Sequence, residues 1–141
     1  MTLYNDIFER FEGKITDYDL KDLLDVNQLM VEILLLNSAI SDFNECKQDL
    51  SNRDDSTVTF NIVLTDLEIE VLSLYMVKQW TSQFKNNQDL LENVLSPNSF
   101  TRYSPANKIN AVIGLYDYSI IEAEIKVSKY IFTSDFIGGL G

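Results

Sequence analysis

The chain of 141 residues contains no histidine and a single cysteine, Cys46. These two shortages exclude the usual catalytic triads and the zinc sites that are built from histidine and cysteine. There is also no glycine-rich phosphate-binding loop, since three of the five glycines, Gly138, Gly139 and Gly141, lie at the C-terminus. We therefore expect no enzymatic activity, no catalytic residue, no cofactor and no bound metal.

Basic residues are scarce, with 11 Lys and Arg against 22 Asp and Glu, so the net charge is −11. Binding of free DNA or RNA is driven by Lys and Arg that displace counterions from phosphates, and the composition argues against it. The whole excess lies in residues 1–70, because residues 71–141 hold equal numbers of acidic and basic side chains. Either the first half is a solvated acidic face, or the two halves meet different surroundings, one open and one packed on a partner.

Long hydrophobic runs are also missing. The most apolar stretch, MVEILLL, is broken by Glu32 and ends at Asn37, which is too short to span a membrane. The N-terminus reads MTLYNDIFER, without the basic and then apolar pattern of a signal peptide. A single cysteine cannot form an internal disulfide, so a reducing compartment fits. The sequence predicts a soluble intracellular protein of one domain.

What the sequence does contain is helical periodicity, which predicts a mainly α fold, a bundle of about five helices. The clearest element is the run LTDLEIEVLSLYMVKQW, residues 64–80. Thr65 and Glu68 form a capping box at its start, and the helix is expected to continue to Phe84. Residues 68–77 are apolar nearly all the way round, as in a central helix that its neighbours cover.

The other expected helices are less strongly marked. Thr2 is a candidate cap for a first helix with Gly13 as its stop, and Ser104–Pro105 is a strong start for a long last helix to about Tyr130. Its regular apolar seam favours core packing, with an intermolecular coiled coil as the alternative. The seam consists of Ile109, Ile113, Tyr116, Ile120, Ala123, Val127 and Tyr130. Between the first and central helices we expect one or two helical turns capped by Thr16, and then a longer helix capped by Asp25 that runs to about Asn44. A short helix is expected before Ser96–Pro97.

Two segments are not expected to be helical. Residues 45–63 read as a polar loop with one extended arm, in which Val58, Phe60 and Ile62 alternate with polar residues. Residues 132–141 read as a flexible tail after a helical domain over 1–131, since its glycines disfavour a helix; it is either frayed or ordered by a partner. The candidate protein-interface residues are Val58, Phe60, Ile62, Phe132, Phe136, Ile137 and Leu140.

Three stretches carry a resemblance to a known family: TLYNDIFERF, CKQDLSNRDD and LTDLEIEVLSLYMVKQW. They resemble small helical proteins encoded among the virion genes of tailed phages of Gram-positive bacteria. The architecture is similar to that of the head–tail connector, or neck adaptor, proteins. The resemblance covers these stretches and most of the helical layout, and none of its motifs is catalytic.

The resemblance implies a structural role in the virion neck, after assembly in the host cytoplasm and without a membrane partner. Connector adaptors form a homo-oligomeric ring, often of twelve copies, below the portal protein. The ring extends the channel through which genomic DNA passes and docks the next neck or tail protein. The loop 45–63 and the segment from Phe132 are the regions that would contact the portal or adjacent copies. An acidic wall would also repel DNA phosphates rather than adsorb them.

Two other readings stay open at this point. One is an acidic inhibitor that mimics DNA and occupies a host or phage DNA-binding protein, which would need exposed carboxylates spaced like phosphates. The other is a different neck or tail-completion protein, which the sequence does not separate from an adaptor.

Overall fold

The computed structural model describes residues 1–17, 28–86 and 105–140, the side chains of 85–86, 105–109 and 134–140 excepted. Within these residues the chain is mainly helical, as the periodicity predicts, with four helices and a small three-stranded sheet. The short helix expected before Ser96–Pro97 lies outside the described residues, as does Asp25, the expected cap of the second long helix.

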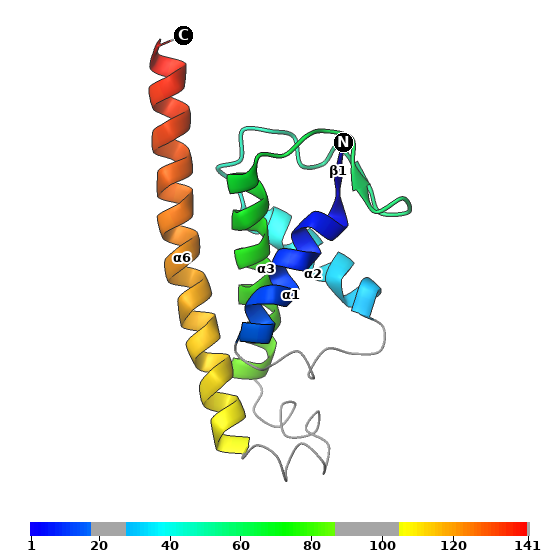
Figure 1. The fold of residues 1–141 in the computed structure, drawn as a ribbon, viewed down its shortest axis with the longest axis vertical. Helices are drawn as coiled ribbons and strands as arrows, with labels where there is room; N and C mark the ends of the chain where they lie inside the picture. The colour runs from blue at the N-terminus through cyan, green and yellow to red at the C-terminus, as the bar shows by residue number, and fades with distance from the viewer. Residues whose placement is uncertain (18–27, 87–104, 141) are drawn as a thin grey trace.

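Helix α3 (Asp66–Asn86) is the central element, and the other described helices pack around it (Figure 1). The predicted capping box is confirmed: the Glu68 N–H donates to Thr65 Oγ1 at 3.2 Å, and the Thr65 N–H donates to Glu68 Oε1 at 2.8 Å. The nearly continuous apolar run that follows is buried on several sides, as predicted. Its most deeply buried members are Val71, Leu72, Leu74, Met76, Val77 and Trp80.

Helix α1 (Tyr4–Asp17) packs on α3 and runs past the expected stop at Gly13. The last turn forms because Ile15 is fully buried and Lys14 pairs with Glu70 of α3. Thr16, predicted to cap a further helix, lies inside this turn, where its hydroxyl donates to the Glu12 carbonyl at 2.7 Å. Tertiary contacts with α3 therefore outweigh the helix-breaking tendency of one glycine.

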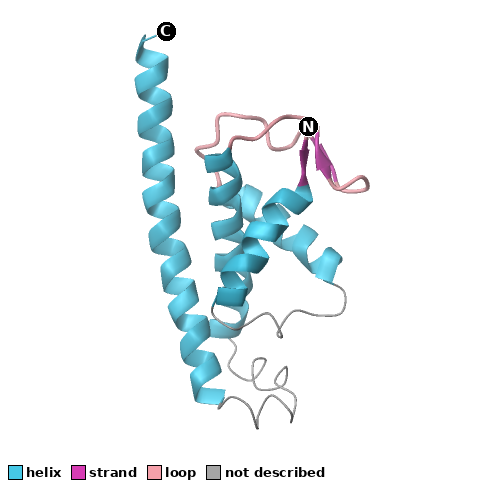
Figure 2. Cartoon of the chain, viewed as in Figure 1, coloured by secondary structure: helices cyan, strands magenta, loops and turns pink. Residues whose placement is uncertain are grey.

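The N-terminus forms a strand where the sequence predicts a helix cap. Strand β1 (Thr2–Leu3) pairs antiparallel with β3 (Thr59–Phe60), which pairs antiparallel with β2 (Arg53–Asp54) (Figure 2). The Thr2 hydroxyl accepts a hydrogen bond from the Leu64 N–H at 2.8 Å instead of capping α1. The loop over 45–63 is thereby tied to the start of the chain.

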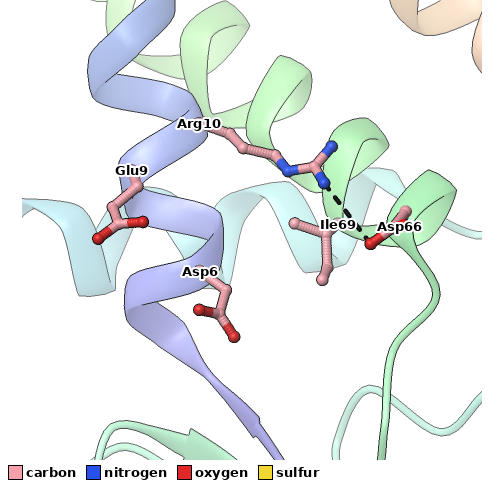
Figure 3. A pocket seen from close by; sticks show the side chains of 5 residues that line it. All are labelled: Asp6, Glu9, Arg10, Asp66 and Ile69. Atoms are coloured by element: carbon pink, nitrogen blue, oxygen red, sulfur yellow. Dashed lines mark ion pairs between the residues drawn. The ribbon is translucent and has the colours of Figure 1, made fainter.

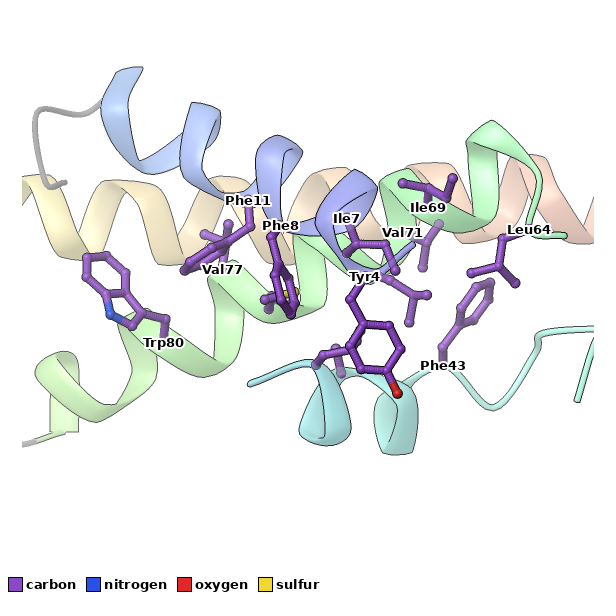
Figure 4. Close-up of a cluster of buried hydrophobic side chains, with 14 of the residues drawn as sticks. Tyr4, Ile7, Phe8, Phe11, Phe43, Leu64, Ile69, Val71, Val77 and Trp80 are labelled. Atoms are coloured by element: carbon purple, nitrogen blue, oxygen red, sulfur yellow. The ribbon is translucent and has the colours of Figure 1, made fainter. Parts of the chain in front are cut away.

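Buried aromatic and aliphatic side chains pack together in the core, many of them from α1 and α3 (Figure 4). The Trp80 ring lies 6.1 Å from Phe11 and 5.2 Å from Phe84, in edge-to-face arrangements that favour ring pairs. Helix α2 (Gln28–Asp42) adds Leu36 and Ala39 from its own side of α3. These contacts form one continuous core, which holds the surfaces described below in fixed positions.

Helix α6 (Pro105–Leu140) is the longest element, with 36 residues, and runs antiparallel to α3 (Figure 1). It begins at Pro105, as predicted, but ends at Leu140 rather than near Tyr130. The flexible tail predicted over 132–141 is therefore wrong for the backbone of residues 132–140, which is helical. Extending an existing helix is easier than starting one, so a packed helix can continue through Gly138 and Gly139 at a cost of about 1 kcal/mol for each glycine.

Candidate protein-interaction surfaces

The inner face of α6 is buried against α3. Of the predicted seam, Ala123, Val127 and Tyr130 are confirmed as buried, whereas Ile113, Tyr116 and Ile120 are half-buried. The side chain of Ile109 lies outside the described residues. In the first half of the described face, the most buried positions are Val112, Leu115 and Ser119. The buried residues of α6, which we call the buried arc, are therefore rotated slightly about the helix axis from the predicted seam. A second set of apolar residues lies on the outside of the helix.

That second set forms what we call the outer stripe. It follows alternating steps of four and three residues, so its members lie on one face of the helix, opposite the buried arc. Four large side chains in it are exposed: Tyr118 by 41%, Ile121 by 56%, Ile125 by 53% and Phe132 by 72%. The outer stripe comprises Gly114, Tyr118, Ile121, Ile125, Ser128 and Phe132.

A buried polar network fixes α6 on α3 near the C-terminal part of the outer stripe. The Tyr130 hydroxyl donates to Glu68 Oε2 at 2.8 Å and accepts from the Lys47 N–H at 2.8 Å. Glu68, only 2% exposed, also accepts from Gln48 Nε2 at 2.6 Å. The capping carboxylate of α3 thus joins three parts of the chain: α3, the loop after α2, and α6.

The electrostatics of this network keep it in one protonation state near neutral pH. Burial by itself raises the pKa of Glu68, but hydrogen bonds from Thr65, Tyr130 and Gln48 outweigh burial, so the pKa lies below its ordinary value. Burial raises the pKa of Tyr130 well above its ordinary value, and raises that of the neighbouring Cys46 thiol to about 11. Cys46 is thus held as a thiol, the unreactive form.

A second exposed apolar area, which we call the α2 patch, lies at the start of α2. It consists of Leu29, Met30 and Leu34, which are 57%, 67% and 62% exposed. Glu32 between them is 3% exposed, so the charge within this stretch is turned into the protein rather than towards the patch. None of the three was among the predicted interface residues.

The predicted arm residues have a different role from the one expected. Phe60 is fully buried, and its ring lies 5.1 Å from that of Tyr4, so its prediction as an interface residue is wrong. Val58 and Ile62 are half-buried and pack against the core. The Val58 carbonyl accepts the Tyr4 N–H at 2.9 Å. The alternating pattern was a strand signal, and the strand closes the core instead of projecting from it.

The predicted tail residues fall on the projecting end of α6. Phe132 is strongly exposed and is part of the outer stripe. The side chains of Phe136, Ile137 and Leu140 lie outside the described ones, so their interface prediction stays a prediction. Of the seven predicted interface residues, Phe132 is the one that the structure places on an exposed apolar surface.

A shallow hollow of about 430 Å³ lies between α1 and α3 (Figure 3). The guanidinium of Arg10 reaches across it, 3.6 Å from the Asp66 carboxylate and 3.7 Å from that of Glu70. The carboxylates of Asp6 and Glu9 point away from Arg10 (Figure 3). The hollow holds solvated ion pairs that join two helices, and such pairs contribute little to stability on an exposed surface.

In the described part of the chain, the Cys, Asp and Glu side chains include no group of three or more placed to hold a metal ion. No helix there combines the length and the hydrophobicity needed to cross a bilayer.

Comparison with known proteins gives no relative. No family model matches the chain, and no curated protein or solved structure is significantly similar to it.

Proposed function

We propose that this chain is a structural protein of a phage virion, a head–tail connector that forms a ring below the portal and docks the next neck or tail protein. The observation that carries the proposal is the outer stripe, which places four large exposed side chains along one face of a helix already anchored on its other face. Extended apolar patches of this kind mark contacts with other proteins. The resemblance of the three sequence stretches supplies the phage context.

The shape of the subunit also supports this role. Helix α6 extends past the loops at the start of α3, so its end is available to a neighbouring molecule (Figure 1). The five-helix bundle predicted from the periodicity would be the body of each subunit. An acidic subunit, repeated around a ring, would give the DNA channel a wall that phosphates do not adsorb to.

The charge distribution is less suited to a DNA mimic. Two carboxylates of the first half are paired within the chain: Glu70 with Lys14 and Arg10, and Asp42 with Lys78 at 3.4 Å. A mimic needs such groups free and spaced like phosphates, so we place the connector role first.

Negative-stain imaging of virions with a labelled copy of the chain tests the proposal. We expect the label at the neck, between capsid and tail. Phe132→Ser should reduce attachment to portal-bearing capsids at least tenfold, whereas the neighbouring exposed Thr133→Ser should attach normally. Complete virions without the chain, or a label confined to another part of the particle, would contradict the proposal.

A further inference from the structure

The loop that joins β2 to β3 contains a strained residue. Of the non-glycine residues that the structure describes, Val58 alone has a positive φ, of 53°. In this left-handed region the Cβ of an L-residue crowds the following carbonyl oxygen, and a β-branched side chain is poorly suited to it. Val58 is the last residue of the loop 55–58, just before Thr59 of β3. Such a conformation persists only where surrounding contacts hold it in place.

Tyr4, at the start of α1, supplies contacts of this kind from two of its atoms. Its N–H donates to the Val58 carbonyl at 2.9 Å, and its hydroxyl donates to Asp55 Oδ1 at 2.7 Å. Tyr4 itself is fully buried, and its ring lies 5.1 Å from that of Phe60. One residue that the core fixes in position thus binds both the first and the last residue of the loop.

The rest of the loop is held less firmly. Residues 55–57 are exposed, and the tip of the hairpin extends away from the helices (Figure 2). The Ser56 hydroxyl donates to Asp54 Oδ1 at 2.6 Å, which is a bond within the hairpin. Asp55 also accepts from Asn37 Nδ2 of α2, at the long distance of 3.4 Å. The two bonds from Tyr4 are therefore the short contacts that join the loop to the helices.

The base of the hairpin is fixed by contacts that do not involve the loop. Phe60 is fully buried, and β3 pairs with both β1 and β2. The Asn61 N–H donates to the Asn52 carbonyl at 3.0 Å, and Arg53 donates to the Leu50 carbonyl at 2.7 Å. Loss of the two Tyr4 bonds can therefore free the loop while the strands stay paired.

We propose that residues 55–58 form a flap, which Tyr4 holds closed against the strain at Val58. The flap opens by a local movement, without unfolding of the helices. Opening lets Val58 adopt an extended backbone and brings the Tyr4 hydroxyl into contact with water. It also changes the shape of the surface beside the N-terminus. The flap is independent of the proposed function, because it depends only on contacts within one chain.

Hydrogen exchange of the folded chain, followed residue by residue by NMR, tests whether the flap opens. The Tyr4 N–H reports opening because it donates to the Val58 carbonyl, whereas the Met76 N–H, within α3, reports unfolding of the whole chain. After correction for intrinsic rates, the Tyr4 N–H should exchange roughly tenfold or more faster than that of Met76. Equal rates would show that the flap opens only when the protein unfolds, and would overturn the inference.

Two variants test whether Tyr4 holds the flap closed. Tyr4→Phe keeps the buried ring and removes the hydroxyl bond, and Asp55→Ala removes the acceptor of that bond. Each should speed exchange at residue 4 by about fivefold and leave Met76 unchanged. Asp49→Ala is the matched control, since it removes an exposed carboxylate outside the flap and should leave exchange at residue 4 unchanged. An unchanged rate at residue 4 in either Tyr4→Phe or Asp55→Ala would overturn the inference.

The pair Val58→Gly and Val58→Ala tests the strain. Both variants lose the packing of the half-buried Val58 side chain, but alanine keeps the Cβ that is crowded at positive φ. Exchange at residue 4 should therefore be roughly threefold or more slower in the glycine variant than in the alanine variant. Equal rates, or faster exchange in the glycine variant, would show that the closed flap is not strained, and would overturn the inference.

Discussion

The two faces of α6 have similar side chains and different surroundings. On the inner face Val112, Leu115 and Val127 are buried against α3, whereas on the outer face Ile121 and Ile125 are more than half exposed. Burial on the inner face removes apolar area from water within one chain, and so stabilises the monomer. The outer face buries less of its apolar area on folding, because Ile121 and Ile125 stay 56% and 53% exposed. A helix that is apolar on both faces can therefore serve folding with one face and association with the other.

The largest expected effect comes from shortening a side chain on the inner face. Leu115→Ala should lower the free energy of unfolding by about 2–5 kcal/mol, because a fully buried leucine leaves a cavity. The matched change on the outer face, Ile121→Ala, should stay within about 0.5 kcal/mol, since the site is exposed and alanine favours helix. Urea unfolding of dilute monomer measures both. Equal losses for the two variants would contradict the division between the faces.

A smaller effect is expected from the polar network that holds the inner face in place. Glu68→Gln should cost about 1–3 kcal/mol at pH 7, because it removes the charge from a buried group that accepts several hydrogen bonds. Tyr130→Phe should cost a similar or smaller amount, since it removes one hydroxyl and leaves the Lys47 N–H without that partner. Neither variant should change association through the outer stripe.

The pH dependence of this loss has a definite sign. The folded-state pKa of Glu68 lies below its ordinary value of 4.5, so its contribution is complete above that pH and is lost as pH falls through the folded pKa. The difference in unfolding free energy between wild type and Glu68→Gln should therefore shrink as pH is lowered below about 4.5. A difference that stays constant down to pH 2 would show that the charge of Glu68 is not what stabilises the network.

The sequence predicts the inner architecture well because local signals and tertiary packing agree there. Thr65 and Glu68 stand at capping-box spacing, and the all-round apolar run after them has no stable place except the centre of the fold. The start of α6 at Pro105 follows from the fixed backbone angle of proline, which suits the first turn of a helix.

The predictions fail where a long-range contact overrides a local preference. Thr2 is a good helix cap, but its hydroxyl accepts a hydrogen bond from the Leu64 N–H instead. Gly13 is a good helix stop, but burial of Ile15 stabilises one more turn beyond it. Phe60 reads equally well as an interface residue or as a core residue, and only its pairing with β1 decides between the two.

The outer stripe has a sequence signal of its own. Tyr118, Ile121, Ile125 and Phe132 follow the same four- and three-residue steps as the predicted seam, on the other face of the helix. Two apolar seams on one helix cannot both face the same neighbour. Which of them packs on α3 depends on the rotation of α6 about its axis, and this rotation is set by the tertiary contacts of Tyr130 and Leu115 rather than by local sequence.

The most direct test of whether the outer face of α6 mediates contacts between chains is sedimentation velocity over a concentration series, for the wild type and for Ile125→Asp. The account predicts that the mean mass of the wild type rises with concentration, while the variant keeps the mass of one chain and the same thermal stability when dilute. A variant that associates as strongly as the wild type, or one that no longer folds, would contradict it.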